Sequence, residues 1–200
     1  MSTQFSVAIL AGGSSRRMGT DKALMDFGGL PLIARAIAAA VPVTDDPFIV
    51  ASAGGAYAEF GLPVHADTVP DQGPLAGLLT GLLQARHPIV VVLACDLPFV
   101  PPEMLRCVTD RLAPHQAAVP RDGPGRLQPL CAAYSATCRT VAEAALAAGR
   151  PGMHQLLDDL DVRVIEAAEF VEHDPDGRIF TNVNDTGGHA RAEAMLDRSG

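Results

Sequence analysis

The feature of this sequence that most constrains its fold is its most apolar and β-branched run, HPIVVVLAC, at residues 87–95. Valine and isoleucine dominate the run, and polar residues do not alternate with apolar ones along it. A strand with two apolar faces is typical of the centre of a parallel sheet, because helices cover both faces of such a sheet. We therefore expect this segment to be a central strand with helices on either side.

Strand and helix patterns alternate along the first half of the chain. Strands are predicted at residues 5–10, 47–52, 62–66 and 87–95, and helices at residues 32–41, 53–60, 74–86 and 101–112. In the second half, strands are predicted at residues 117–120, 128–134 and 162–167, and helices at residues 135–148, 153–160 and 186–196. This order predicts a three-layer α/β/α sandwich with a Rossmann-like, mostly parallel sheet and a small β excursion in the second half.

Composition and charge exclude several classes of function. The chain has 200 residues and shows no repeat or linker, so we expect a single domain. Its formal net charge of −8 argues against nonspecific binding to nucleic acid or to an anionic membrane. No apolar run reaches the roughly 18 residues of a membrane span, and no secretory signal precedes the first strand. We expect a cytoplasmic protein in which any anionic substrate needs a local positive site.

The cysteines and histidines give no sign of a metal centre or a disulfide framework. Cys95, Cys107, Cys131 and Cys138 show neither a CxxC pair nor the spacing of a zinc site. We expect them to be buried free thiols, which suit a reducing compartment. The six histidines show no paired metal spacing and are interpreted as surface or structural groups.

A glycine-rich loop with basic residues, LAGGSSRRMGTDKAL at residues 10–24, follows the first predicted strand. It matches neither the Walker phosphate loop nor the GxGxxG dinucleotide fingerprint. Its glycines still let backbone N–H groups approach an anion, while Arg17 can form a bidentate fork and Lys22 supplies a compact positive charge. Lys22 is also the single lysine in the chain. The loop is either a phosphate-binding site or a glycine turn with solvated arginines.

An aspartate follows the apolar central strand. Asp96 lies in the segment CDLP, and ligands bind at the carboxyl ends of the strands in open α/β sheets. A carboxylate there suits Mg²⁺, which takes one or two carboxylates and completes its shell with substrate phosphates. The alternative is an Asp that caps a turn before Pro98. A basic glycine loop together with an Mg²⁺ ligand indicates phosphoryl or nucleotidyl transfer.

Two further segments follow predicted strands. DTVPDQGPLAGL at residues 67–78 opens a helix at its GP pair, and the N–H groups at that helix start can face a base or a phosphate. A plain capped loop is the alternative. In FTNVND at residues 180–185, Asn182 and Asn184 share one face if the segment is extended, or the segment leads into a helix cap.

The motifs together resemble a known family. LAGGSSRRMGTDKAL followed by GGLPL resembles the LAGG-x-RMG-x-DK-x-L…G-x-PL signature of nucleotidyltransferases that activate small phosphorylated compounds. With GPLAGL, CDLPF and the late FTNVN added, nearly the whole chain resembles the molybdenum cofactor guanylyltransferases. That family implies Mg²⁺-dependent attack of the molybdopterin phosphate on the α-phosphorus of GTP, which yields the guanine dinucleotide cofactor and pyrophosphate. It also implies transient contacts with cofactor-biosynthesis proteins or apo-molybdoenzymes.

The resemblance also implies which residues carry the reaction. Arg17, Lys22 and Asp96 would be catalytic, the two cations by holding phosphates and Asp96 as the Mg²⁺ ligand. The residues implied in nucleotide binding are Leu10, Ala11, Gly12, Gly13, Lys22, Asp67, Gly73, Pro74, Leu75, Gly77 and Asp96. Residues 1–112 would form the nucleotide-binding part and residues 113–200 the acceptor-binding part. The residues implied in acceptor binding are Arg126, Asn182 and Asn184.

One stretch departs from the family pattern. ASAGG at residues 51–55 stands where the family often has an asparagine that meets the nucleotide, and Ser52 is the available substitute. No general base is evident, and none is required, because a phosphate nucleophile is already ionised near neutral pH. The alternatives are a cytidylyltransferase acting on the same pterin, a sugar-phosphate nucleotidyltransferase and an inactive nucleotide-binding regulatory module. The presence of Lys22 and Asp96 argues against the last of these.

Overall fold

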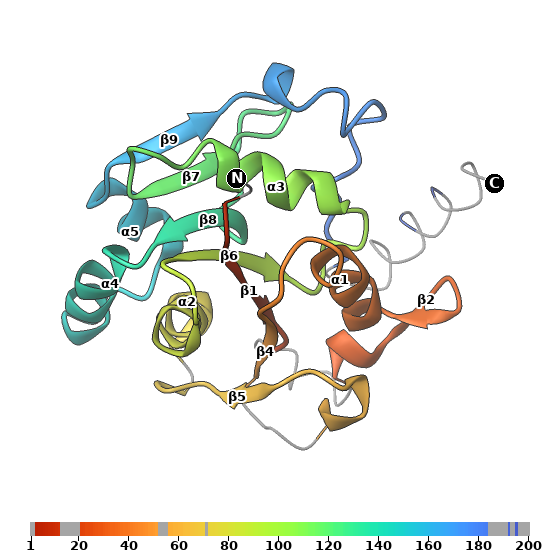
Figure 1. Cartoon of the computed structure of the whole chain (residues 1–200), viewed down its shortest axis with the longest axis horizontal. Helices are drawn as coiled ribbons and strands as arrows, with labels where there is room; N and C mark the ends of the chain where they lie inside the picture. The colour runs from red at the N-terminus through yellow and green to blue at the C-terminus, as the bar shows by residue number, and fades with distance from the viewer. Residues whose placement is uncertain are drawn as a thin grey trace.

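The computed structural model describes residues 3–12, 21–51, 56–70 and 72–183, together with Ala192 and Met195. Within these residues the main sheet has seven strands in the order β5-β4-β1-β6-β8-β7-β9 (Figure 1). The strands are β1 (Ser6–Leu10), β4 (Pro47–Ala51), β5 (Val64–Ala66), β6 (Ile89–Ala94), β7 (Ala117–Pro120), β8 (Cys131–Ser135) and β9 (Val162–Ile165). Of these strands β8 alone runs against its neighbours, so the sheet is mostly parallel.

Helices cover both faces of this sheet. The helices are α1 (Leu32–Ala40), α2 (Gly73–Gln84), α3 (Pro102–Asp110), α4 (Cys138–Ala147) and α5 (Met153–Asp158). Helices α1 and α3 pack on one face, whereas α2, α4 and α5 pack on the other (Figure 1). The result is the three-layer α/β/α sandwich that the sequence predicts. The β excursion of the second half joins the main sheet as β8, β7 and β9.

The apolar run at residues 87–95 becomes β6, near the middle of the sheet. Val91 and Leu93 point to the α1 and α3 side, while Val90 and Val92 point to the α2 and α4 side. All four are buried, because each face of the strand meets a helical layer. The absence of alternation in the sequence therefore has the expected physical cause, which is burial of both faces.

Two glycines of α2 allow this helix to lie close to β1. A Cβ added at Gly81 would lie 3.0 Å from the Cβ of Ala8, and one added at Gly77 would lie 3.1 Å from a methyl group of Leu10. Such distances are tighter than ordinary van der Waals contact, so a side chain at either position would require its neighbour on β1 to shift. The close approach places the N-terminal part of α2 beside the end of β1, where the glycine-rich loop begins.

Several elements differ from their predicted bounds. The helix expected at residues 53–60 is a single 3₁₀ turn, Ala58–Phe60, which ends at Gly61 with φ of +71°, while residues 52–55 lie outside the described residues. A small hairpin, β2 (Asp26–Phe27) and β3 (Leu30–Pro31), was not expected from the sequence. The helix expected at residues 186–196 falls outside the described residues except for Ala192 and Met195.

The four cysteines lie in the buried interior. Cys95, Cys107, Cys131 and Cys138 are all buried free thiols, as expected. Burial raises the pKa of the Cys95 and Cys131 thiols to about 12, so both are neutral at physiological pH.

In the described part of the chain, no helix is long and apolar enough to cross a membrane.

An ionic cluster around Asp46 lies at the amino-terminal ends of β1 and β4. Its carboxylate accepts hydrogen bonds from Ser6 Oγ at 2.6 Å, from Arg86 N at 2.9 Å and from Arg86 Nε at 2.8 Å. Burial opposes ionisation of Asp46, but these donors outweigh it, so the pKa of the carboxyl lies below its usual value. The cluster ties β1 and the start of β4 to the segment before β6.

We expect Asp46→Asn to lower the free energy of unfolding by about 1–3 kcal/mol at pH 7, since an amide cannot accept all three bonds. A depressed pKa contributes stability above the unfolded value of about 3.9, and this contribution disappears as pH falls through the folded value. Urea unfolding at pH 7 and at about pH 2 tests both points. The two proteins should differ at pH 7 and converge in acid, and an equal difference at both pH values would contradict this role.

Candidate functional site

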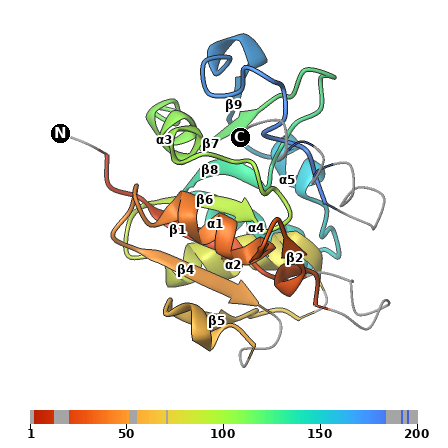
Figure 2. The same cartoon turned by 90° about the vertical axis from the view of Figure 1, so that its right-hand side faces the viewer.

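Two charged side chains meet at the carboxyl edge of the sheet. Lys22 Nζ lies 3.1 Å from Asp96 Oδ2, and the two side chains are 17% and 21% exposed. The residues are 74 positions apart in the sequence, but they follow β1 and β6, which are parallel neighbours with Leu10 opposite Ala94. Figure 2 shows the arrowheads of β4 and β6 pointing to this same edge. Sheet topology therefore brings the pair together.

The backbone of Lys22 is held by a short 3₁₀ turn, Lys22–Leu24. Asp21 caps this turn, because its Oδ1 accepts a hydrogen bond from Ala23 N at 3.1 Å. The second oxygen of the same carboxylate accepts a bond from the Tyr57 hydroxyl at 2.6 Å. Asp21 thus connects the segment that carries Lys22 to the segment that follows β4.

Asp96 has one carboxylate oxygen for which the described residues provide no hydrogen bond. Its Oδ1 is buried and lacks a donor among them, while Oδ2 receives the Lys22 ammonium. A buried anionic oxygen without a donor is costly, and a cation is the usual partner for such an atom. Among the described residues, no group of three or more His, Cys, Asp or Glu side chains could hold a metal. One carboxylate suits Mg²⁺ when substrate phosphates complete its shell.

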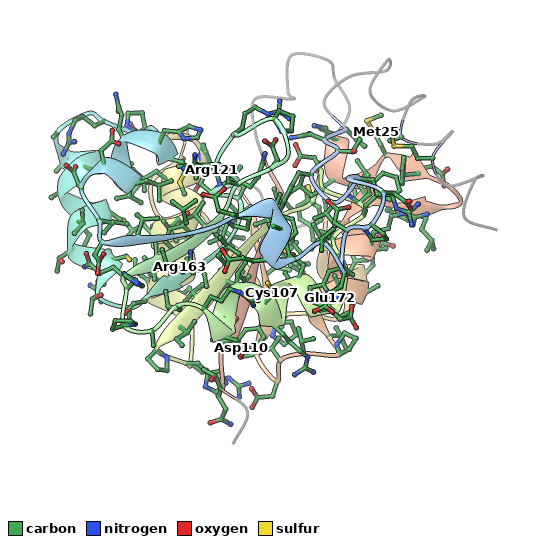
Figure 3. The ribbon with its side chains drawn as sticks, turned by 90° about the horizontal axis from the view of Figure 1, so that it is seen from above. Met25, Cys107, Asp110, Arg121, Arg163 and Glu172 are labelled. Carbon is green, nitrogen blue, oxygen red and sulfur yellow. The ribbon has the colours of Figure 1, made fainter. Side chains whose placement is uncertain are left out.

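A small apolar cluster lies beside this ion pair. It contains Phe27, Leu32, Val183 and Ala192, with Met25 and Phe99 packed against it. Phe27 and Phe99 meet edge to face with ring centroids 5.7 Å apart, and the backbone N of Val183 donates to the carbonyl of Asp96 at 3.0 Å. Met25, which is labelled in Figure 3, marks where this cluster lies in the structure. The cluster joins the segments that carry Lys22, Asp96 and Asn182.

The loop after β5 is organised by Asp67. Its Oδ1 accepts from Val69 N at 3.2 Å and from the hydroxyl of Thr80 at 3.3 Å. Thr80 is fully buried in α2, and its Oγ1 also accepts from Thr68 N at 3.0 Å. This network ties the loop after β5 to α2 through the buried Thr80 hydroxyl.

The start of α2 separates exposed residues from buried ones. Gly73 and Pro74 are exposed, and Gly73 has φ of +70°, which lies in the left-handed region that favours glycine. Leu75 is fully buried and Gly77 is buried against Leu10, so both position the helix by packing. The described geometry leaves the first two residues of the helix as those that a ligand can reach.

The end of β1 is likewise mostly engaged in the sheet. The carbonyl of Leu10 accepts from Cys95 N at 3.2 Å, and Ala11 N donates to the carbonyl of Val50 at 2.9 Å. Gly12 is the first exposed residue after the strand. Gly13, Arg17 and Asn184, and also Ser52, lie outside the described residues.

A cleft of about 960 Å³ opens next to Asp96. It brings together four of the residues singled out from the sequence, namely Pro74, Asp96, Arg126 and Asn182. Its apolar side includes Phe170 and Phe180, whose rings meet edge to face at 5.7 Å. The cleft therefore combines the Asp96 carboxylate, the Arg126 guanidinium and an apolar side. Lys22, Leu10 and Asp67 do not line it.

Arg126 is held by a buried carboxylate in its own loop. Asp122 is 7% exposed and accepts bonds from Arg126 N at 2.7 Å, from Arg126 Nε at 2.8 Å and from Gln128 Nε2 at 3.0 Å. The backbone of Arg121, which is labelled in Figure 3, pairs with Leu127 to close the loop. The Arg126 side chain remains 70% exposed, so its guanidinium is oriented and can still meet an anion.

Sequence reasoning missed four residues that organise the site. They are Asp21, Tyr57, Thr80 and Asp122. Asp122 precedes a Gly-Pro-Gly turn, and Asp21 precedes Lys22 directly, so an Asp that caps a turn was a usable signal in both cases. Tyr57 and Thr80 carried no local signal, because their partners are distant in the sequence.

Comparisons with known proteins point to one family. A family model described as the MobA-like NTP transferase domain matches residues 7–164. The molybdenum cofactor guanylyltransferase of Pseudomonas putida is 39% identical over 168 residues, which cover 82% of this chain and 87% of that protein. The molybdenum cofactor guanylyltransferase of Desulfosudis oleivorans is 32% identical over 189 residues, which cover 94% of each.

Solved structures have the same fold. Molybdopterin-guanine dinucleotide biosynthesis protein A from Archaeoglobus fulgidus superposes with a TM-score of 0.83 at 26% identity, and the match covers 96% of this chain and 99% of that one. The 2-C-methyl-D-erythritol 4-phosphate cytidylyltransferase from Thermus thermophilus superposes with a TM-score of 0.70 at 18% identity, over 95% and 98% of the two chains. The second likeness concerns the fold alone.

Proposed function

The chain belongs to the MobA-like NTP transferase family and is a nucleotidyltransferase, and on that premise we propose that it transfers GMP from GTP to molybdopterin with release of pyrophosphate. The observation that carries the proposal is the Lys22–Asp96 pair at the ends of β1 and β6, beside the cleft. The names of the relatives support guanine as the base and molybdopterin as the acceptor.

The proposed reaction joins two polyanions. A phosphate oxygen of molybdopterin forms a bond to the α-phosphorus of GTP, the bond from that phosphorus to the bridging oxygen breaks, and its electron pair leaves with pyrophosphate. The nucleophile is already ionised, so the protein has to position the reactants and offset their charge. The Lys22 ammonium supports this, because it is a preorganised donor at the sheet edge, in a chain of net charge −8.

Asp96 is the residue proposed to hold Mg²⁺. The bound cation would neutralise charge on the phosphates and on the leaving pyrophosphate. Support comes from the buried Oδ1, which lacks a donor among the described residues, and from the preference of Mg²⁺ for few carboxylates plus phosphate oxygens. The Lys22 ammonium already neutralises Asp96 in part in this structure.

The cleft is proposed to receive the acceptor. Part of its lining is apolar, which suits the ring system of a pterin, and the oriented guanidinium of Arg126 suits an anionic group. Asn182 lies in the same cleft, next to Val183, which is bonded to Asp96. We accordingly propose residues 1–112 as the nucleotide-binding part and residues 113–200 as the acceptor-binding part. Gly12, Asp67, Gly73 and Pro74 would meet the nucleotide.

The setting proposed for this reaction is the cytoplasm, which suits four buried free thiols. The dinucleotide product would then pass to cofactor-biosynthesis proteins or apo-molybdoenzymes through transient contacts.

The four nucleotides GTP, CTP, ATP and UTP differ only in the base, so their comparison tests the substrate proposal most directly.

Pyrophosphate release should therefore be measured with molybdopterin, Mg²⁺ and each nucleotide in turn. We expect release with GTP to exceed that with the other three by at least about 10-fold in kcat/KM, and to require molybdopterin. A preference for CTP would replace the guanylyl by the cytidylyl assignment, and release with a sugar phosphate in place of molybdopterin would change the acceptor. Binding of GTP without release under any condition would favour a regulatory module.

A further inference from the structure

Two hydrogen bonds of Asp21 hold the backbone turn that carries Lys22 against the loop after β4. The Tyr57 hydroxyl donates to Asp21 Oδ2 at 2.6 Å, and Asp21 Oδ1 accepts from Ala23 N at 3.1 Å. Lys22 lies between Asp21 and Ala23 in the sequence, and its Nζ donates to Asp96 Oδ2 at 3.1 Å. Tyr57 and Asp21 are 36 positions apart, so the contact joins two separate loops at the carboxyl edge of the sheet.

Tyr57 is a fixed donor. Its side chain is 2% exposed and packs in the same core cluster as Ala23 and Cys95. Burial, together with its hydrogen bond to Asp21, raises the pKa of the phenol, so the hydroxyl stays protonated and donates a hydrogen bond to the carboxylate. Asp21 is exposed and could be hydrated instead, and the buried tyrosine therefore constrains a side chain that water would otherwise satisfy.

We propose that Tyr57 and Asp21 are positioning residues for Lys22, which they hold at a set place relative to Asp96. The proposal rests on the proposed function for the role of Lys22 in catalysis. Lysine has a flexible stem with several rotatable bonds, so the position of its ammonium depends on how firmly its backbone is held. A 3₁₀ turn of three residues is short, and a cap anchored to a buried phenol supplies the rigidity that the turn lacks.

A chemical experiment tests the positioning without any assay of turnover. Lys22 is the single lysine, so an amine reagent such as acetic anhydride at trace concentration modifies one side-chain amine. The labelling rate is read by mass spectrometry relative to the α-amine of the polypeptide. Asp96→Asn, which removes the carboxylate charge, calibrates the rate of a released lysine.

We expect Tyr57→Phe and Asp21→Asn to raise the labelling rate of Lys22 by about 3-fold, which is the worth of a partly exposed ion pair. Thr109→Val is the matched control, because Thr109 is also buried and its hydroxyl donates to the carbonyl of Leu105 at 2.8 Å within α3. The control should leave the rate unchanged. An unchanged rate in Tyr57→Phe would overturn the proposal.

A kinetic cycle adds the functional readout. Tyr57→Phe should lower kcat by about 10-fold with little change in the KM for GTP, because misplacement of a group mainly affects the transition state. In the Lys22→Ala background the same change should cost nothing more, whereas independent, additive losses would contradict a role through Lys22. If the parent protein does not use GTP, the proposed function fails while the labelling result still decides the positioning.

Discussion

Replacing Asp96 with alanine is expected to lower the rate of nucleotidyl transfer by at least about 10³-fold. The carboxylate is the proposed ligand for the metal, and it also holds the Lys22 ammonium in the free protein. Its removal therefore takes away a cation site and leaves the neighbouring donor without its partner. Pyrophosphate release at saturating GTP, molybdopterin and Mg²⁺ measures the loss.

This variant is expected to fold as stably as the parent protein. The buried Oδ1 of Asp96 lacks a donor among the described residues, so the carboxylate adds little to stability in the absence of a cation. Thermal denaturation should show this. Asp45→Ala is the matched control. Asp45 also forms ion pairs, with His87 and Arg86, but it lies at the amino-terminal end of β4, away from the site, and its side chain is 66% exposed. The Asp45→Ala protein should keep the parental rate. A near-normal rate in Asp96→Ala would show that Asp96 has no role in the reaction.

Replacing Lys22 with alanine is expected to lower the rate by about 10²-fold or more, as the loss of a preorganised donor does. The ammonium stands at the sheet edge with its side chain 17% exposed, where a charge acts more strongly than in bulk water. The effect should fall mainly on kcat, because charge accumulates on the departing pyrophosphate. Steady-state kinetics with GTP as the varied substrate separate kcat from KM.

A second substitution at the same position tests the kind of cation. Lys22→Arg keeps the charge but replaces a compact ammonium by a larger planar group, so we expect it to remain at least about 10-fold slower than the parent. Arg139→Ala is the control for the loss of a cation elsewhere, because Arg139 is 52% exposed and pairs with Glu143 on α4. Full activity in Lys22→Ala would show that the other donors suffice.

The fold could be predicted because its signal is local. The run that becomes β6 is apolar on both faces, and this property is visible in nine consecutive residues at positions 87–95. The order of strand and helix patterns then led to a parallel sheet between two helical layers. The short hairpin of β2 and β3 was missed, since each strand has two residues and no periodicity can be read from so few.

The site could be predicted in part. The placement of Lys22 and Asp96 at the ends of strands followed from the general rule for open α/β sheets. Their 3.1 Å contact did not, because it depends on β1 and β6 being neighbours, and strand order is not written in any local segment. Leu75 and Gly77 were predicted at the nucleotide; both are buried, and Gly77 packs against Leu10 at the end of β1.

The sequence by itself determined the chemistry that this chain can offer: one lysine, a basic glycine loop and an aspartate after the most apolar strand. Only the tertiary structure decided which groups act on one another. Tyr57 and Asp21, or Lys22 and Asp96, become partners when loops converge at one edge of the sheet. The physical reason is that residue type sets charge and hydrogen-bonding capacity locally, whereas distance between side chains is set by strand order and helix packing over the whole chain.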